Sequence, residues 1–380
     1  MVTPEENELL TRIGPGTRMG ALMRRYWQPI STSGEMLELR AKRVRLLGEN
    51  LVLSRNGAGG YDLIEESFPR GRTPAAYLVG ELGGLLWAYL GPLPAPLIPR
   101  LDGLVAEGTI RILGSAVIPC NWLQIMENSL DAVHTEWLHG HFFEFIKESE
   151  GLKVSFTQRH VKIGFDEFEY GIVKRRVLEG HTEEDDDWKI GHPVVFPTTL
   201  AIGNASPAWH EYRFQFRVPI DDTHTKHYWF GAFVLPNGAE APAHLLDRVH
   251  EYETPIFQPN GDFMLDSIHG QDIMAWVSQG AIADRSRESL GSTDRGITLY
   301  RRMLLRELKR IEDGHDPKNV IRDPGRNGLI VLPLEGQKAQ RADGFEALFR
   351  RHQVRYSPIA EEILAVLRSA RAPQLVSTPV

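Results

Sequence analysis

The sequence contains one cysteine, Cys120, among its 380 residues. A single thiol cannot form an intramolecular disulfide, which excludes the class of small secreted domains stabilised by disulfides. The first ten residues, MVTPEENELL, lack both the basic and the apolar region of a secretory signal peptide. These absences predict a cytoplasmic protein.

Long apolar runs and basic clusters are also missing. No stretch reaches the roughly eighteen consecutive apolar residues of a membrane-spanning helix, so we expect no membrane association. The net charge is -7, and Lys and Arg are not clustered, which argues against a nucleic-acid-binding protein. A chain of this length has room for two domains.

Hydrophobic patterning predicts an α+β protein. A short helical lead over 1–27 precedes short strands over 39–89, and the proline-rich segment 91–100 closes this region. Further on, the patterns predict strands and amphipathic helices. The acidic run Glu183–Asp187 is interpreted as a solvated loop. We expect helices from residue 121, from residue 271, over 294–314 and over 358–373, and strands over 207–220 and 223–236.

The segment Asp131–His141 contains one aspartate and three histidines. Asp131 and His134 are three residues apart and would share one face of a helix, where a carboxylate can hold the ring N–H of a metal-bound imidazole. His139 follows His134 by five residues and fits the same ion only if the helix breaks or contains a π-bulge. His141 would lie about 10 Å along the axis from His134, too far for a shared ion. Spacing therefore favours His134 and His139.

A third ligand is needed to complete a metal site with two histidines. Two histidines and one carboxylate, with open positions, are typical of non-haem Fe(II) centres that activate oxygen. The carboxylate can come from a distant part of the chain. We favour Asp272, with Asp266 and Asp284 as alternatives that spacing does not rank.

Several segments resemble one family. The order of Glu127, Asn128, Asp131, His134 and His139 is similar to the iron-binding helix of Rieske-type non-haem iron oxygenases of the phthalate-dioxygenase-like group. The resemblance implies a helix-grip catalytic domain over 111–380, an antiparallel sheet wrapped around helices, with Asp272 as the carboxylate ligand. It assigns Asp131 and Asn128 to catalysis. Other segments that resemble the group are residues 13–30, 217–225 and 271–304.

The chain departs from the family where the [2Fe–2S] cluster should be. A Rieske cluster needs two cysteines and two histidines. Residues 1–110 contain neither residue type; Ser67 and Phe68 stand where the first Cys-x-His-type motif would lie, and the second motif is absent. Cys120 is interpreted as a small buried apolar residue. We therefore expect a truncated, Rieske-like β domain over 1–110 without a cluster.

Oxygen activation then requires electrons from elsewhere, and three hypotheses follow. In the favoured one, a partner chain, a cluster-bearing oxygenase subunit or a reductase, supplies electrons to a working Fe(II) site. In the second, the chain is an inactive structural or regulatory subunit of a hetero-oligomeric oxygenase. In the third, the iron performs chemistry that needs no cluster. Intact Asp131, His134, His139 and Asp272 favour the first, because buried polar groups without a metal are costly to keep.

The resemblance implies hydroxylation or demethylation of a small aromatic or heteroaromatic compound with O2, by a monooxygenase or dioxygenase reaction. It also implies a hetero-oligomer built on the family's trimer, in which a partner's Rieske domain covers Asp131. The substrate pocket should lie near the strands that follow the acidic run. Candidate pocket residues are Phe196, Asn204, Trp209 and His210.

Overall fold

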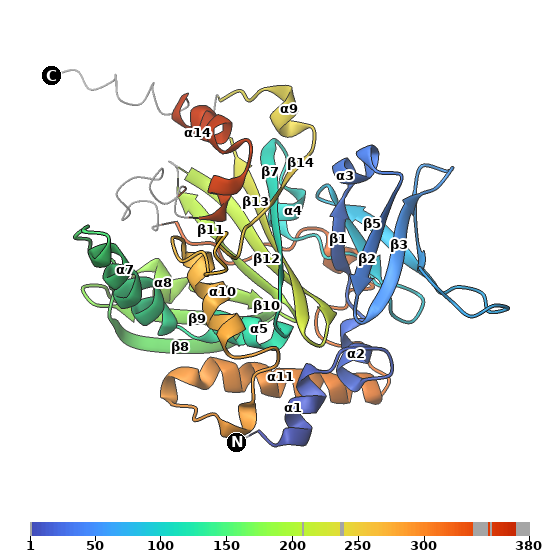
Figure 1. Cartoon of the computed structure of the whole chain (residues 1–380), viewed down its shortest axis with the longest axis horizontal. Coiled ribbons are helices and arrows are strands. Elements are labelled where there is room, and N and C mark those ends of the chain that lie inside the picture. The colour runs from blue at the N-terminus through green and yellow to red at the C-terminus, as the bar shows by residue number, and fades with distance from the viewer. Residues whose placement is uncertain (1, 207–208, 236–238, 337–348, 350–351, 370–380) are drawn as a thin grey trace.

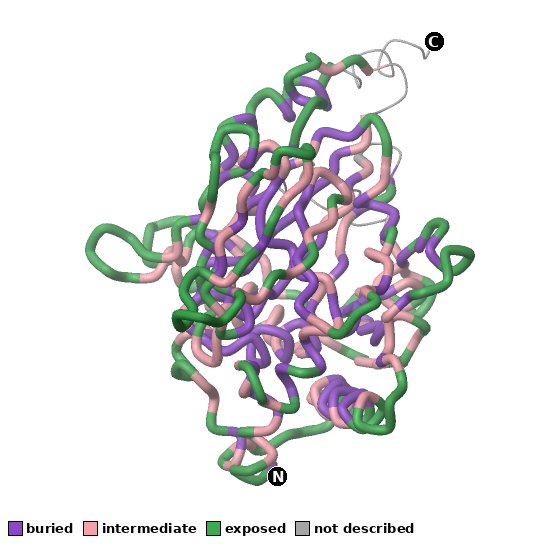
Figure 2. The backbone as a smooth tube through the Cα atoms, turned by 90° about the vertical axis from the view of Figure 1, so that its right-hand side faces the viewer, coloured by how far each residue is buried: buried purple, intermediate pink, exposed green. Residues whose placement is uncertain are grey.

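The computed structural model describes every residue except 1, 207–208, 236–238, 337–348, 350–351 and 370–380. Two sheets with helices around them make up the described chain, as the sequence predicted (Figure 1). Buried residues follow the central strands, whereas exposed ones concentrate in peripheral loops (Figure 2). No helix within the described ranges is long and apolar enough to cross a lipid bilayer.

The first sheet is built from residues 28–89 and has six antiparallel strands in the order β1-β6-β5-β4-β3-β2. Two helices of the predicted lead and one further short helix accompany it. The elements are α1 (Pro4–Thr11), α2 (Arg18–Met23), β1 (Gln28–Thr32), α3 (Ser33–Glu38), β2 (Ala41–Leu46), β3 (Glu49–Arg55), β4 (Tyr61–Glu65), β5 (Ala76–Leu82) and β6 (Leu85–Tyr89).

The second sheet has eight strands in the order β14-β7-β13-β12-β11-β10-β9-β8. Its pairs are antiparallel except β14 with β7. The strands are β7 (Thr109–Ile118), β8 (His160–Phe168), β9 (Gly171–Leu178), β10 (His192–Val195), β11 (Thr199–Ser206), β12 (Trp209–Asp221), β13 (His224–Val234) and β14 (Val249–Glu253).

Helices connect and cover the strands of the second sheet. They are α4 (Asp102–Val105), α5 (Trp122–Leu130), α6 (His134–Glu136), the π-helix η1 (Trp137–Phe142), α7 (Phe143–Ser149), α8 (Asp186–Lys189), α9 (Ala243–Leu246), α10 (Ile268–Ser278), α11 (Arg295–Glu312) and α14 (Ala360–Ser369). Short 3-10 turns are η2 (Arg285–Arg287), η3 (Ser292–Asp294), η4 (Pro324–Asn327) and η5 (Gln353–Tyr356).

The apolar residues of helix α11 recur with the helical period and form its buried face. Tyr300, Leu304 and Leu308, which recur every four residues along the helix, are buried, and Ile297 packs at the edge of the same core. Burying each of the two leucine side chains contributes about 1.5–3 kcal/mol. This face contacts α5 and α2, so α11 supports the segment that leads to the histidines (Figure 1).

Helix α5 is buried almost all round and is held by polar contacts at fixed points. The Asn121 side chain accepts from the Leu123 N–H at 3.0 Å and caps the helix. The Gln124 side chain donates to the carbonyls of Trp276 and Gly280, at 2.8 and 2.9 Å. These two bonds tie α5 to the end of α10, the helix that carries Asp272.

Candidate metal centre

The chain breaks and rewinds between α5 and the two predicted histidine ligands. Asp131 is the C-cap of α5 with an extended backbone, so Asp131 and His134 do not share a helical face, contrary to our prediction. His134 begins α6, and His139 lies in the π-helix η1. The π geometry provides the i to i+5 spacing that the sequence argument required.

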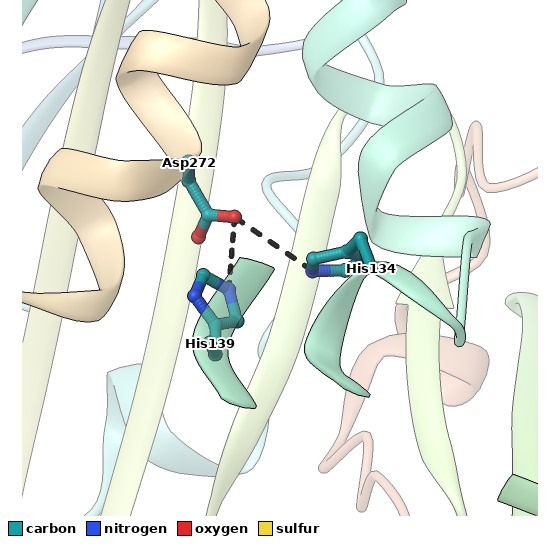
Figure 3. A group of neighbouring side chains, drawn as sticks. All are labelled: His134, His139 and Asp272. Atoms are coloured by element: carbon teal, nitrogen blue, oxygen red, sulfur yellow. Dashed lines mark ion pairs between the residues drawn. The ribbon is translucent and has the colours of Figure 1, made fainter. Parts of the chain in front are cut away.

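His134, His139 and Asp272 converge on one point (Figure 3). Nε2 of His139 lies 3.1 Å from Oδ1 of Asp272, and Nε2 of His134 lies 3.7 Å from the same oxygen. The three side chains are only 10–15% exposed. Asp272, which follows His139 by 133 positions, is thus brought to the histidines because α10 packs against both α5 and η1.

This arrangement fits a divalent metal ion. The Oδ1 atom of Asp272 is buried. Although Nε2 of His139 is 3.1 Å away, no described residue forms a hydrogen bond with this oxygen. A buried carboxylate oxygen in this state is costly unless a cation accompanies it. Two imidazole nitrogens and one carboxylate oxygen form the donor set of a facial Fe(II) triad. We therefore assign His134, His139 and Asp272 as the residues that would hold the metal.

Each histidine is oriented through its other ring nitrogen. Nδ1 of His139 lies 2.8 Å from Oε1 of Gln271, and Nδ1 of His134 lies 2.8 Å from the backbone oxygen of Asp131. An oxygen that only accepts requires a protonated Nδ1, which leaves both Nε2 atoms free to bind a metal. The orienting group of His134 is therefore a backbone carbonyl. The Asp131 carboxylate, which we expected in this role, is 3.6 Å away.

The charges of the three groups depend on one another. Burial opposes the negative charge of Asp272, but His139 and His134 outweigh it and lower the pKa of Asp272 to about 2. Burial disfavours the charged form of His139, but Asp272 outweighs burial and raises the pKa of His139. At His134 burial prevails and lowers the pKa. The lowered pKa values of Asp272 and His134 favour an ionised carboxylate and a neutral imidazole, the forms that bind a metal, whereas the raised pKa of His139 favours a proton that a metal would displace.

The other candidate ligands do not join the triad, although Asp266 lines the same cavity. His141 is exposed, with Nδ1 3.3 Å from the Thr157 hydroxyl and its ring against Trp137. Asp266 forms an ion pair with Arg355 at 2.5 Å. Asp284 caps η2 through the Ser286 N–H. Cys120 is fully buried, which matches its interpretation as an apolar residue.

The residues assigned to catalysis have different surroundings. Asn128 faces the cavity beside the triad, and its side chain makes no hydrogen bond with the described residues. The Asp131 side chain is 28% exposed but does not line that cavity. Its carboxylate accepts from the Val133 N–H at 2.8 Å. Asn128 thus borders the cavity, whereas Asp131 does not.

Glu127, part of the motif that carried the family resemblance, has a structural role. Its carboxylate accepts from Arg285 at 2.8 Å and from Arg301 at 2.7 Å, and all three side chains are at most 10% exposed. Two charged bonds to a buried carboxylate fix the end of α5, since breaking such a pair typically costs about 3–5 kcal/mol.

A cavity of about 360 Å³ opens beside the triad. Of the pocket residues we predicted, Asn204 lines it. Phe196 does not; it borders a separate cavity between the two sheets. His210 does not line the cavity either and packs against Tyr212. The side chain of Trp209 lies outside the described residues. The sequence did not reveal Gln271, Lys174 or Arg176, because single polar residues on a strand or helix carry no motif.

A second group of titratable side chains lies near the cavity. Nε2 of His192 lies 2.7 Å from Glu335 and 3.8 Å from Asp187. Arg176 donates to Asp187 at 3.0 Å, so this group forms an ion-pair network. Asp187 belongs to the acidic run that we interpreted as a solvated loop. For Asp187 that prediction was wrong, since its side chain is only 12% exposed.

The chain is similar in sequence to known oxygenase subunits. Residues 118–310 match the family described as Vanillate O-demethylase oxygenase C-terminal domain. The 5,5'-dehydrodivanillate O-demethylase oxygenase subunit of Sphingobium sp. is 34% identical over 403 aligned positions, which cover 92% of each chain. The phthalate 4,5-dioxygenase oxygenase subunit of Pseudomonas putida is 28% identical, with 83% of this chain and 88% of the relative covered.

Solved structures show the same fold at low identity. NdmA of Pseudomonas putida CBB5 superposes with a TM-score of 0.53 at 15% identity, covering 78% of this chain and 94% of NdmA. A fluorene-bound complex of carbazole 1,9a-dioxygenase oxygenase with ferredoxin gives a TM-score of 0.55 at 15% identity, covering 82% and 95%.

Fold, donor set and sequence matches together define an oxidoreductase of the non-haem iron oxygenase class. The chain belongs to the vanillate O-demethylase oxygenase family, within the phthalate-dioxygenase-like group of Rieske-type oxygenases.

Proposed function

We propose that this chain is the catalytic subunit of a multicomponent oxygenase. It uses one Fe(II) and O2 to hydroxylate or demethylate an aromatic or heteroaromatic compound, with electrons from a Rieske cluster on a partner chain. The observation that carries the proposal is the convergence of His134, His139 and Asp272 beside a 360 Å³ cavity. Such a volume suits one small aromatic molecule.

The iron would be held by His134, His139 and Asp272, and when bound it supplies the oxygen-activating chemistry. The protein's own residues orient the metal-binding side chains and the substrate. Gln271 and the Asp131 carbonyl keep both Nε2 atoms directed at Asp272, and Asn128 presents an amide to the cavity. The cavity walls surround the substrate and limit its contact with water.

Delivery of electrons from another chain is supported by the residue types that the N-terminal region lacks. Residues 1–110 have no cysteine or histidine, and only residues 66–75 connect β4 to β5. This region therefore lacks the residue types that ligate a Rieske cluster.

The position of Asp131 supports the same arrangement. Its carboxylate is partly exposed and does not line the cavity, while its backbone oxygen lies 2.8 Å from Nδ1 of His134. A cluster-bearing domain that docks here would lie against a residue three positions from His134. We infer a hetero-oligomer built on a trimer, in which the partner's Rieske domain covers Asp131.

A reconstitution experiment tests the proposal. The purified chain, loaded anaerobically with Fe(II), is mixed with a co-purifying Rieske protein, its reductase, NADH and a panel of methoxylated or N-methylated aromatic compounds. We expect O2-dependent product only when all components are present. Product without the Rieske protein would refute delivery of electrons by a partner.

The alternative is a catalytically inactive subunit of a hetero-oligomeric oxygenase. It predicts no iron retention after anaerobic loading, and unchanged turnover of the assembled enzyme when His139 is replaced by Ala. The intact donor set with a buried Asp272 argues against this alternative.

A further inference from the structure

The short helix that carries His134 cannot hold this side chain in place by itself. Helix α6 contains only three residues, His134–Glu136, and no described side chain caps it with a hydrogen bond. A first helical turn fixes several backbone dihedrals for a single hydrogen bond, so a helix of this length is not stable alone. The position of His134 must therefore depend on contacts with neighbouring elements.

Strand β9 provides a rigid neighbour for this segment. The strand pairs with β8 on one side and with β10 on the other, so both of its edges are occupied. Lys174 and Arg176 are two residues apart on β9 and so point to the same face of the sheet, and both line the cavity beside the triad. Side chains on a strand that is held on both sides are precise anchors.

Lys174 contacts the start of the segment that carries His134. Its Nζ donates to the backbone oxygen of Asp131 at 3.1 Å, and the same oxygen lies 2.8 Å from Nδ1 of His134. Lys174 is a buried residue, so water competes little for this bond. Because the two side chains share one carbonyl, Lys174 fixes the peptide group against which the His134 ring is oriented.

Arg176 contacts the other end of the segment through Thr135. Its Nη1 donates to the Thr135 hydroxyl at 3.2 Å, and this hydroxyl donates to the Ala132 carbonyl at 2.8 Å. Nε2 of His160 lies 3.5 Å from the same hydroxyl, at the limit of a hydrogen bond. Because Thr135 follows His134 directly, its hydroxyl ties the neighbour of a metal-binding residue both to the preceding turn and to β9.

The guanidinium of Arg176 is itself held by Asp187. Its Nε donates to Asp187 at 3.0 Å, and the two side chains are only 13% and 12% exposed. Asp187 belongs to α8, which packs against β9. A charge-assisted bond with so little exposure restricts the planar guanidinium to one orientation, with Nη1 directed at Thr135. The acidic run is thereby connected to the metal site.

We propose that Thr135 is a positioning residue for His134 and that it acts through Arg176. Lys174 and Arg176 hold the segment at its two ends, residues 131 and 135, and His134 lies between these ends. The orientation of His134 is therefore set from β9 and not by its own short helix. This inference rests on the proposed function, since it concerns a metal-binding side chain of the same site.

Fe(II) binding by the full chain tests the inference without a partner chain or turnover. Thr135→Val removes the hydroxyl but keeps the shape of the side chain and the charge of the site. Anaerobic competition with a chromogenic chelator should show Fe(II) bound about 10- to 100-fold more weakly, as for other residues that orient a metal ligand. Thr135→Ser keeps the hydroxyl and should recover most of the affinity. Thr157→Val is the matched control and should bind Fe(II) like the wild type, because the Thr157 hydroxyl lies 3.3 Å from His141, a histidine outside the triad.

Two further measurements separate the orientation of His134 from a general loss of structure. The visible absorption of the Co(II)-loaded protein reports the geometry of the metal ligands, so its bands should shift in Thr135→Val and stay unchanged in Thr157→Val. In an Arg176→Met background, Thr135→Val should weaken Fe(II) binding by a smaller factor than in the wild type, because the bond between the two side chains is already absent.

Three outcomes would overturn the inference. The first is that Thr135→Val, with its fold verified by circular dichroism, binds Fe(II) like the wild type. The second is that Thr135→Ser recovers no affinity, and the third is an equal loss in both backgrounds, which would make the hydroxyl a local contact. A wild-type chain that binds neither Fe(II) nor Co(II) would refute the proposed function and the inference together. Metal binding that depends on Thr135, without turnover of the reconstituted enzyme, would refute only the proposed function.

Discussion

Nδ1 of His139 lies 2.8 Å from Oε1 of Gln271, the residue that directly precedes Asp272. One turn of α10 thus supplies both Asp272 of the triad and the group that orients His139. The Gln271 amide nitrogen donates to the Leu265 carbonyl at 3.0 Å, which fixes its oxygen toward the imidazole. The π-helix and α10 are therefore coupled at the triad.

Replacing Gln271 by Leu should weaken Fe(II) binding about 10- to 100-fold, because His139 loses the acceptor that sets its tautomer and orientation. Anaerobic competition with a chromogenic chelator measures this affinity. Gln271→Glu, which keeps an acceptor, should bind iron with near wild-type affinity. Gln279→Leu on the exposed end of α10 is the control, and an equal loss there would contradict the assignment.

Ala at His134, His139 or Asp272 should abolish stoichiometric iron binding while far-ultraviolet circular dichroism stays unchanged. His141→Ala should retain the metal, because that side chain is exposed and bonded to Thr157. Iron content, measured by plasma emission spectroscopy, shows which variants retain the metal. The ligand assignment is wrong if His141→Ala loses iron and His139→Ala keeps it. The same samples should contain no acid-labile sulfide.

Asp131→Ala should leave iron bound, because His134 is oriented by the backbone oxygen of residue 131, which the substitution keeps. Electron delivery should fall severely, since the carboxylate placed between the donor and His134 is gone. Stopped-flow reoxidation of the partner's reduced cluster, followed by its visible absorbance, measures the rate. Asp166→Ala, 65% exposed on β8, is the control. A normal rate in Asp131→Ala would exclude this electron route.

His227 predicts a specific dependence of stability on pH. Its ring is fully buried, and its centroid lies 4.2 Å from the ring centroid of Trp229 and 5.5 Å from that of Trp276. Neither ring nitrogen makes a hydrogen bond with a described residue. Burial, with Arg217 and His269 nearby, lowers its pKa well below the ordinary value. Below about pH 6.5 the unfolded chain therefore binds a proton that the native state does not, and stability falls as pH falls.

His227→Phe preserves the ring stack and removes this proton. Relative to the wild type, the variant should gain about 1.4 kcal/mol of unfolding free energy for each pH unit below about 6. Denaturant titrations of the metal-free proteins at pH 8, 6 and 5 provide the comparison. A difference that is independent of pH would show that His227 titrates normally in the native state.

Much of the candidate site could be predicted from local sequence. The five-residue spacing of His134 and His139 required a break or a π-helix, because an ideal helix separates the two rings, and the structure contains a π-helix at Trp137–Phe142. The predicted strands and amphipathic helices were confirmed within the described residues, because their periodicity follows from backbone geometry; residues 207–208, 236 and 370–373 of these predictions lie outside that part of the chain. The shared helical face of Asp131 and His134 was wrong, since the C-cap of a helix is set by its surroundings.

Sequence by itself determined which chemistry is possible: two histidines and an aspartate for a metal, and no cysteine or histidine in the first 110 residues for a cluster. Tertiary structure alone decided which aspartate joins the histidines, since Asp266 pairs with Arg355 and only α10 packing brings Asp272 to η1. It also decided that Gln271 orients His139 and that Arg176 faces the cavity. The physical reason is that ligand type is a local property, whereas distance between remote residues depends on how helices and strands pack.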